Sequence, residues 1–151
     1  MNPTARLDEQ LCFALYAASR AMTARYRPLL EALGLTYPQY LAMLVLWEHD
    51  GLGVGELGER LQLDSGTLTP LLKRLETAGL VNRSRRPSDE RSVEVRLTDA
   101  GQALRAQAGM VPERLLCNTD LTADHLFRLR DELKALTATL ATPNPTDGDS
   151  P

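Results

Sequence analysis

The chain has 151 residues and a formal net charge of −3, with 43% hydrophobic residues and only 5% aromatic ones. Its length is about that of one domain, and its leucine- and alanine-rich composition is typical of a mainly helical soluble protein. Since no apolar run approaches the roughly 20 residues that a membrane helix needs, and the N-terminus lacks the basic-then-apolar order of a secretory signal, we expect a cytoplasmic protein.

The apolar pattern predicts a long first helix over residues 8–33, with Asp8 as its N-cap and Gly34 after its end. Cys12 lies in the first turn of this helix, and the second cysteine, Cys117, follows much later in the chain. Because cytoplasmic thiols are kept reduced, a permanent disulfide is not expected. Each cysteine is therefore either an inert packing residue or part of a redox switch.

Residues 36–49 form a second predicted helix, which is rich enough in leucine to be buried on most sides. After it, Gly53, Gly55 and Gly58 spell G-x-G-x-x-G. A dinucleotide fingerprint requires a preceding strand and a βαβ unit, whereas helical segments flank this one. We therefore interpret the glycines as a turn and a close approach of two helices rather than as a nucleotide site.

The segment 54–79 has the form of a short helix, a turn and a longer helix. Leucines at helical spacing mark the inward face of the longer helix, namely Leu68, Leu71, Leu72 and Leu75. Ser65 or Thr67 is expected to cap this helix, and Gly79 closes it. Pro70 keeps the start of the helix within about one turn. This is a helix-turn-helix pattern.

Two stretches of alternating residues, 81–86 and 92–97, flank the turn-prone segment 87–90 and predict a β-hairpin. A helix-turn-helix followed by such a hairpin is a winged helix. Further helices are expected from Thr98, with an interruption by Pro112, and from Thr122, where leucines at steps of three and four suit packing against another helix. The tail 142–151 has no apolar face and is expected to be disordered.

Positive charge is concentrated in the middle region, with eight Lys and Arg residues against five Asp and Glu residues between Arg60 and Arg96. An α-helix fits the major groove of B-DNA, and the outward residues of the longer helix are Ser65, Thr67, Thr69, Lys73 and Arg74. The arginines around the hairpin tip, which suit the narrow minor groove, are Arg83, Arg85, Arg86 and Arg91. This basic patch outweighs the acidic net charge and predicts DNA binding. Alternatively, Asp89 pairs with Arg91 and fixes the turn.

The sequence resembles the MarR family of winged-helix repressors and, within it, the organic hydroperoxide sensors of the two-cysteine type. The resemblance is carried by "LCFALY" (11–16), "LTYPQYLAMLVLWE" (35–48), "LDSGTLTPLLKRLETAGLV" (63–81) and "SDERSVEVRLT" (88–98). The winged-helix segments indicate only DNA binding of the MarR type, whereas the N-terminal cysteine with "LTYPQY" indicates peroxide sensing. The fold implied is mainly α with a small β-hairpin wing. One MarR-like chain would span 1–141, with dimerisation helices at about 7–33 and 99–141 around a winged helix-turn-helix region at about 35–98.

The resemblance implies a homodimeric repressor that leaves a pseudo-palindromic operator when an organic hydroperoxide oxidises Cys12. Cys117 would then act as the resolving thiol of a disulfide. Tyr26 and Tyr37 match the family tyrosines that hydrogen-bond the reactive cysteine. No cofactor, metal ion or catalytic residue is implied.

The residues support part of this chemistry without the resemblance. A thiolate attacks a peroxide to give a sulfenic acid, which a second thiol converts to a disulfide. The N-terminus of the helix lowers the pKa of a thiol, but Asp8 and Glu9 oppose this effect, which favours tyrosine hydroxyls as the stabilising groups. Fourteen residues on one helix span about 21 Å, so Tyr26 reaches Cys12 only from a partner subunit, with the first helices antiparallel across a twofold axis. Whether a disulfide forms within or between subunits stays open.

Three alternatives compete with peroxide sensing. The first is a MarR-type repressor that is released by a small phenolic ligand, with Cys12 as an ordinary packing residue. The second is a thiol peroxidase, which would have no use for a basic hairpin. The third is a winged helix used only for protein contacts, which tight and salt-sensitive DNA binding would exclude.

Overall fold

The computed structural model describes residues 6–142, without the side chains of Glu90 and Arg91. The chain divides into two compact units, Met1–Leu115 and Leu116–Pro151. Apart from residue 142, the predicted disordered tail lies outside the described residues. Within residues 6–142, no helix combines the length and the apolar content that a membrane span requires.

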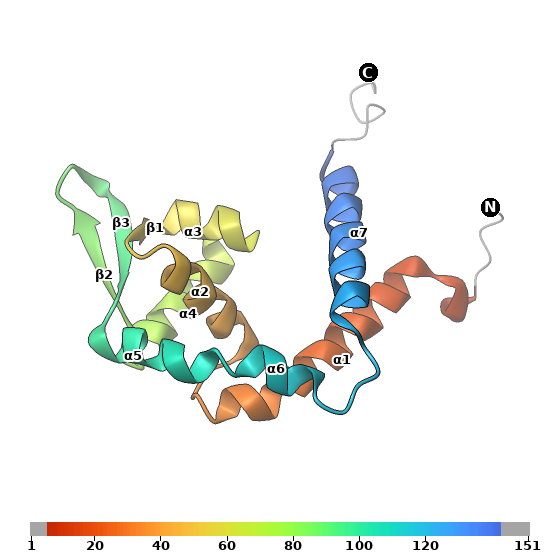
Figure 1. The fold of residues 1–151 in the computed structure, drawn as a ribbon. Coiled ribbons are helices and arrows are strands. Elements are labelled where there is room, and N and C mark those ends of the chain that lie inside the picture. The colour runs from red at the N-terminus through yellow and green to blue at the C-terminus, as the bar shows by residue number, and fades with distance from the viewer. Residues whose placement is uncertain (1–5, 143–151) are drawn as a thin grey trace, which may run out of the picture. The chain divides into compact units, whose positions relative to one another are not determined.

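The first unit is mostly helical and carries one small sheet (Figure 1). A short 3-10 helix, η1 (Leu7–Glu9), precedes six helices, which are α1 (Leu11–Glu31), α2 (Tyr37–Glu48), α3 (Val54–Leu61), α4 (Ser65–Thr77), α5 (Asp99–Ala108) and α6 (Val111–Leu116). The strands are β1 (Leu52–Gly53), β2 (Val81–Arg86) and β3 (Asp89–Leu97). The predicted winged helix, mainly α with a small β wing, is confirmed.

The first long helix begins later than the sequence predicts. Asp8 lies in η1, where its carboxylate accepts hydrogen bonds from the Arg6 guanidinium at 3.0 and 3.2 Å. Gln10 takes the N-cap position instead, without a side-chain hydrogen bond to the helix. The prediction of Asp8 as the cap is therefore wrong, because a charged guanidinium donor competes successfully with the backbone amides for its carboxylate. Cys12 still lies in the first turn of α1, as predicted.

The helix α2 forms the centre of the core. Its N-terminus is a capping box, in which Thr36 Oγ1 accepts from the Gln39 amide at 3.4 Å and Gln39 Oε1 accepts from the Thr36 amide at 2.8 Å. Its buried residues are Tyr40, Ala42, Met43, Leu46 and Trp47. The Trp47 indole donates to the Gly101 carbonyl oxygen at 2.9 Å and so joins α2 to α5. The prediction that this helix is largely buried is confirmed.

The helices α3 and α4 form the predicted helix-turn-helix. Four leucines of α4 are buried, as the spacing predicts, namely Leu68, Leu71, Leu72 and Leu75. The N-cap is Asp64 rather than Ser65 or Thr67, and its carboxylate accepts from the Thr67 amide at 2.7 Å. Of three neighbouring residues able to cap, the first is selected because its oxygen reaches the amide three residues later. Gly79 follows the helix in the left-handed conformation (φ 76°), as expected for its end.

The sheet has three antiparallel strands in the order β1-β3-β2. β2 and β3 are the predicted hairpin, whereas β1 was not predicted, because two residues give no alternation to recognise. Its Leu52 and Gly53 pair with Val95 and Glu94 of β3. Part of the glycine-rich segment is therefore a strand rather than a turn. The predicted close approach of two helices occurs at Gly58 of α3, where an added Cβ would lie 3.4 Å from Leu68 Cδ2 of α4 and 2.9 Å from the Leu63 carbonyl oxygen in the turn between them.

The helices after the sheet begin at their predicted caps. Thr98 Oγ1 accepts from the Gly101 amide at 3.0 Å at the start of α5. The chain breaks between the end of α5 and the start of α6, next to Pro112, as predicted. In the second unit, Thr122 Oγ1 accepts from the His125 amide at 3.2 Å and starts α7 (Ala123–Ala141). α7 has no buried residue.

Candidate functional site

The outward face of α4 is polar, as required of a helix that enters a DNA groove. Its five predicted contact residues are all exposed, namely Ser65, Thr67, Thr69, Lys73 and Arg74. The opposite face is occupied by the buried leucines. Hydroxyls near the start of the helix are suited to phosphates and base edges, and the basic pair a turn later adds positive charge.

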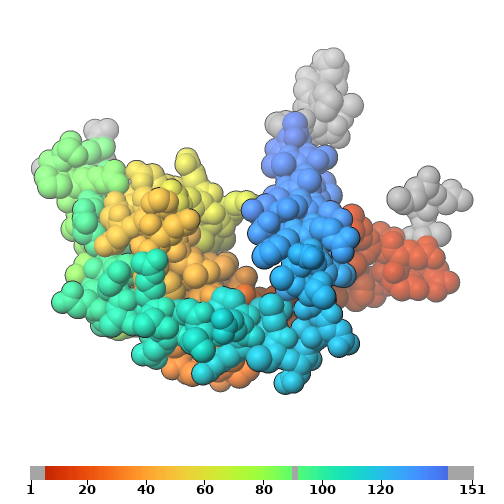
Figure 2. Space-filling model, in the orientation of Figure 1, coloured from red at the N-terminus to blue at the C-terminus, as the bar shows by residue number. Residues whose placement is uncertain are grey.

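The hairpin of β2 and β3 projects from the helices of the first unit as a narrow ribbon, seen in green in Figures 1 and 2. Arg85 is exposed on it. Arg86 is only 28% exposed and lies between two carboxylates, those of Glu56 and Glu94. Asp89 is exposed, but the Arg91 side chain lies outside the described residues. The structural pairing of Asp89 with Arg91 therefore stays a prediction.

A third wing arginine joins the sheet to α4. Arg83 of β2 donates through Nε to Glu76 Oε2 of α4 at 2.6 Å, and both side chains are partly shielded from solvent. A short charge-assisted hydrogen bond of this kind fixes direction as well as distance. Arg83 therefore holds the base of the wing against α4.

Cys12 is exposed in the first turn of α1. The apolar side chains beside it are exposed too, since Leu11, Phe13 and Tyr16 retain 61%, 40% and 59% of their accessible surface. Asp8 and Glu9 lie 3.0 and 3.8 Å from Arg6. This guanidinium partly balances the charge of the two carboxylates that precede α1.

Tyr26 and Tyr37, the two predicted thiolate partners, lie together at the junction of α1 and α2. Their ring centroids are 4.9 Å apart, and Tyr40 adds a third ring 5.8 Å from Tyr26. Burial, followed by the neighbouring Tyr37 and Tyr40 hydroxyls, raises the pKa of Tyr26 to about 12. Its hydroxyl therefore keeps its proton at neutral pH and remains a hydrogen-bond donor.

The structure does not bring Cys12 and Tyr26 together within one chain. Both residues belong to the single helix α1, which runs from Leu11 to Glu31. Their separation of fourteen residues corresponds to about 21 Å along a helix. Cys117 is exposed, follows α6 and belongs to the second unit, whereas Cys12 belongs to the first.

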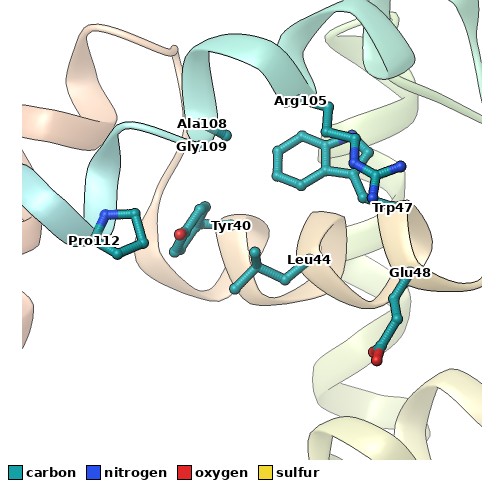
Figure 3. A pocket seen from close by; sticks show the side chains of 8 residues that line it. All are labelled: Tyr40, Leu44, Trp47, Glu48, Arg105, Ala108, Gly109 and Pro112. Atoms are coloured by element: carbon teal, nitrogen blue, oxygen red, sulfur yellow. The ribbon is translucent and has the colours of Figure 1, made fainter. Parts of the chain in front are cut away.

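Two pockets adjoin the tyrosine cluster in the first unit. One, of about 440 Å³, lies between α1 and α2 and includes Tyr37 in its lining. The other, of about 240 Å³, is lined by α2 on one side and by α5 and α6 on the other (Figure 3). Tyr40 and Trp47 form its aromatic wall, and Arg105 places a guanidinium at its edge. The first is within the size range of small-molecule sites, and the second is somewhat below it.

Sequence reasoning missed two features of these sites. Tyr40 belongs to the aromatic cluster, and its position three residues after Tyr37 on one helix was a usable signal. The carboxylates that hold the wing arginines were missed as well, namely Glu56, Glu76 and Glu94. Glu56 and Glu76 come from the helices α3 and α4, outside the hairpin, so no alternation along the strands indicates them.

Comparisons with known proteins agree with this geometry. The model of the MarR family matches residues 35–93. The chain is 50% identical over 135 residues to the organic hydroperoxide resistance transcriptional regulator of Bacillus subtilis, covering 89% of this chain and 92% of that protein. It is also 52% identical over 136 residues to the HTH-type transcriptional regulator TtmR of Methylorubrum extorquens, covering 85% and 70% of the two chains.

Solved structures of AbfR, a protein of Staphylococcus epidermidis, are similar as well. Reduced AbfR bound to DNA superposes with a TM-score of 0.80 at 37% identity, over 91% of this chain and 96% of that one. Disulfide-formed AbfR superposes with a TM-score of 0.68 at 36% identity, over 91% and 94%.

Proposed function

Because the chain belongs to the MarR family of transcriptional regulators, we propose that it is a homodimeric repressor that leaves its operator when an organic hydroperoxide oxidises Cys12. The regulator itself is a DNA-binding protein and not an enzyme. Its site of action is the cytoplasm, where its operator DNA lies, and no cofactor or metal takes part.

The chemistry needs one thiolate and one further thiol. The Cys12 thiolate attacks one oxygen of the hydroperoxide and breaks the O–O bond, which leaves a sulfenic acid on the protein and releases the alkoxide, protonated to an alcohol. The Cys117 thiol then displaces water from the sulfenic sulfur and forms a disulfide. The hydroperoxide is reduced by two electrons, and the two thiols are oxidised by the same two.

The observation that carries the proposal is the position of Cys12 in a patch of exposed apolar side chains on α1. Leu11, Phe13 and Tyr16 would not remain in water at a surface of this kind unless a partner covered them. An antiparallel partner helix across a twofold axis would cover them and bring the partner's Tyr26 and Tyr37 toward Cys12. Protonated tyrosine hydroxyls at that place stabilise a thiolate by hydrogen bonding.

DNA recognition uses α4 and the wing. A twofold dimer reads half-sites about 34 to 36 Å apart, so its two recognition helices must keep a matching separation. The exposed α4 residues would enter the major groove, with Arg85 and Arg91 of the wing at the flanking minor groove and Asp89 holding the turn. A disulfide between Cys12 and Cys117 would alter the separation of the recognition helices and lower the affinity without any chemical change at the DNA surface.

Operator binding in the presence of a hydroperoxide tests the proposal. Wild-type protein and the Cys12→Ser and Cys117→Ser variants are titrated onto the best-binding duplex selected from a random pool, before and after one equivalent of tert-butyl hydroperoxide. We expect release of the wild type and continued binding by Cys12→Ser. If the hydroperoxide released Cys12→Ser from the duplex as readily as the wild type, the proposed thiol switch would be excluded. A non-reducing gel of the wild type, with Cys117→Ser as its control, separates a disulfide between subunits from one within a chain.

A second candidate is a repressor released by a small phenolic ligand. The pockets beside Tyr37 and Tyr40 favour it, since both adjoin α2, which leads into the helix-turn-helix. Under this alternative, the Cys12→Ser variant would keep its full response to the natural inducer. A fluorescence-based thermal shift screen of phenolic acids against Cys12→Ser protein would detect such a ligand.

A further inference from the structure

Arg86 of the wing is directed toward the protein and not toward the tip of the hairpin. Its Nη1 and Nη2 both lie 3.4 Å from Glu56 Oε1 of α3, and its Nε lies 3.8 Å from Glu94 Oε2 of β3. Glu94 is the most shielded of these groups, with 13% of its side chain exposed. Arg96 also contacts Glu94, at 2.5 Å, so that two arginines share one carboxylate.

Strand alternation accounts for this direction. Ser84 of β2 lies opposite Glu94 of β3, so their side chains share one face of the sheet. Arg86, two residues after Ser84, belongs to the same face and meets Glu94 there, whereas Arg85 lies opposite Val93 on the other face and is exposed. The register shifts only beyond this point, where Arg86 lies opposite Asp89 next to the turn.

Two glycines provide the space for this ion-pair network. An added Cβ on Gly53, where β1 meets α3, would lie 3.4 Å from Arg86 Nη2. An added Cβ on Gly51 would lie 2.9 Å from Glu94 Oε1 and 3.1 Å from Arg96 Cζ. The glycines before α3 therefore have a structural reason that nucleotide binding does not supply.

The network is neutral as a whole, because Arg86 and Arg96 balance Glu56 and Glu94. A guanidinium that is already paired with two carboxylates offers little net attraction to a phosphate. It connects three elements instead, since α3 belongs to the helix-turn-helix and β2 and β3 form the wing.

We propose that Arg86 is a positioning residue that sets the wing against α3, and that it is not one of the groups that contact DNA. Pairing with Glu56 fixes the angle between hairpin and helix-turn-helix, and so the distance from Arg85 to the recognition helix α4. This inference rests on the proposed operator binding, and it replaces the sequence-based prediction that Arg86 reaches the groove.

The salt dependence of operator binding separates the two roles. Each phosphate contact contributes about 0.9 to the slope of log K against log salt concentration, so the loss of one contact per subunit lowers the slope of a dimer by about two. Arg85→Ala, on the adjacent exposed residue, is the matched control and should show this loss. Arg86→Ala should bind about fivefold more weakly with an unchanged slope. A slope lowered as in Arg85→Ala, or an unchanged affinity, would overturn the proposal.

The sign of the Glu56→Gln effect gives a second test. Removing an acidic charge near DNA strengthens binding if electrostatics alone decide the outcome. If Glu56 holds Arg86, the same change weakens binding, and the double variant Arg86→Ala/Glu56→Gln is no weaker than the poorer single variant. Glu56 is exposed on α3 and glutamine keeps its shape, so this variant retains the fold. Tighter binding by Glu56→Gln, or additive losses in the double variant, would contradict the inference.

These outcomes are distinct from failure of the proposed function. If the wild type binds no selected duplex, the repressor proposal fails and the wing is not tested through DNA. In that case, hydrogen exchange of the β2 amides serves as the readout, and the loss of Arg86 should speed exchange at the end of β2 that precedes the turn. Unchanged exchange would overturn the positioning role by itself.

Discussion

The winged-helix region buries its apolar residues, whereas the two long terminal helices leave most of theirs exposed. Five residues of α2 and four of α4 are buried within their own chain. By contrast, α1 buries only Leu30, near its C-terminal end, and α7 buries none. On α7, Phe127, Leu129, Leu133 and Leu140 all remain exposed.

This difference indicates that the apolar residues of the sequence serve two purposes, a core within the chain and an exposed surface outside it. The winged helix closes its own core, so its fold is specified within the chain. The apolar faces of α1 and α7 specify a surface whose completion, in our proposal, is a second subunit. The residues of the proposed thiol switch follow the same division, because Cys12 lies in the part of α1 without buried residues and Tyr26 lies nearer the end that buries Leu30.

Leucine-to-alanine substitutions in the two regions should have the largest effects and should differ in whether they weaken folding or dimerisation. Leu72→Ala removes a fully buried side chain and should lower the free energy of unfolding by about 4 kcal/mol. Leu133→Ala should instead weaken dimerisation, by about a hundredfold in dissociation constant, since the dimer loses two such side chains and each contributes about 1.5 kcal/mol on burial. Urea unfolding at two protein concentrations and sedimentation equilibrium measure both effects. A loss for Leu133→Ala that is independent of concentration would show that α7 needs no partner.

A substitution at Gly101 tests how closely α5 packs in the core of the winged-helix region. An added Cβ there would collide with the Leu80 carbonyl oxygen, and the Gly101 carbonyl also accepts from Trp47. We expect Gly101→Ala to lower the free energy of unfolding by about 3 kcal/mol. Gly55→Ala is the control, because nothing lies within 4 Å of its added Cβ and alanine favours a helix by up to about 1 kcal/mol. Thermal denaturation of both variants checks this, and equal melting temperatures would count against the packing described.

Tyr26→Phe sharpens the comparison at the boundary between the two regions. If a partner's hydroxyl donates to the Cys12 thiolate, its loss should slow the reaction of Cys12 with a hydroperoxide by about tenfold, since a hydrogen bond to a charged group contributes about 1.5 kcal/mol or more. The rate of Cys12 oxidation by tert-butyl hydroperoxide measures this in the Cys117→Ser background. The test should be run above and below the dissociation constant of the dimer, because monomeric protein should show no difference between tyrosine and phenylalanine. Identical rates in the dimeric wild type and variant would show that Tyr26 does not belong to the site.

The smallest expected effect concerns the cap of the recognition helix. Hydrogen bonds from Thr67, chiefly from its backbone amide, hold the pKa of Asp64 below its usual value. A carboxylate with a lowered pKa stabilises the fold above its ordinary pKa and loses that contribution as the pH falls through the lowered value. Asp64→Asn keeps a good cap without titrating, so its stability should depend less on pH in the acidic range. Urea midpoints between pH 3 and 6 measure this, and parallel curves for the two proteins would contradict it.

Local patterns predicted those parts of the fold that depend on neighbours in the sequence. Leu68 to Leu75 gave the inward face of α4, and Thr98 and Thr122 gave two helix starts, because periodicity and caps act over a few residues. The predictions of Asp8 as one cap and of Ser65 or Thr67 as another were wrong, since several groups compete for each carboxylate or each cap. β1 was too short to show a period.

The exposed face of α4 was predicted from helical spacing, whereas the direction of a wing arginine was not. Tyr26 and Tyr37 were predicted only as partners of Cys12, and their packing against each other was not expected. Arg86 was expected at the DNA groove, but its side chain is directed toward Glu56, which lies thirty residues earlier in the sequence. Such a pairing depends on tertiary contacts that no sequence pattern contains.

The most direct test follows operator release and thiol oxidation in the same sample. Labelled duplex bound to reduced protein is titrated with substoichiometric tert-butyl hydroperoxide, while anisotropy reports the bound fraction and mass spectrometry reports the oxidation state of each cysteine. The account predicts that release rises in proportion to oxidised Cys12 and reverses with dithiothreitol. Complete oxidation of Cys12 with the operator still bound, or release while Cys12 is still a thiol, would contradict it.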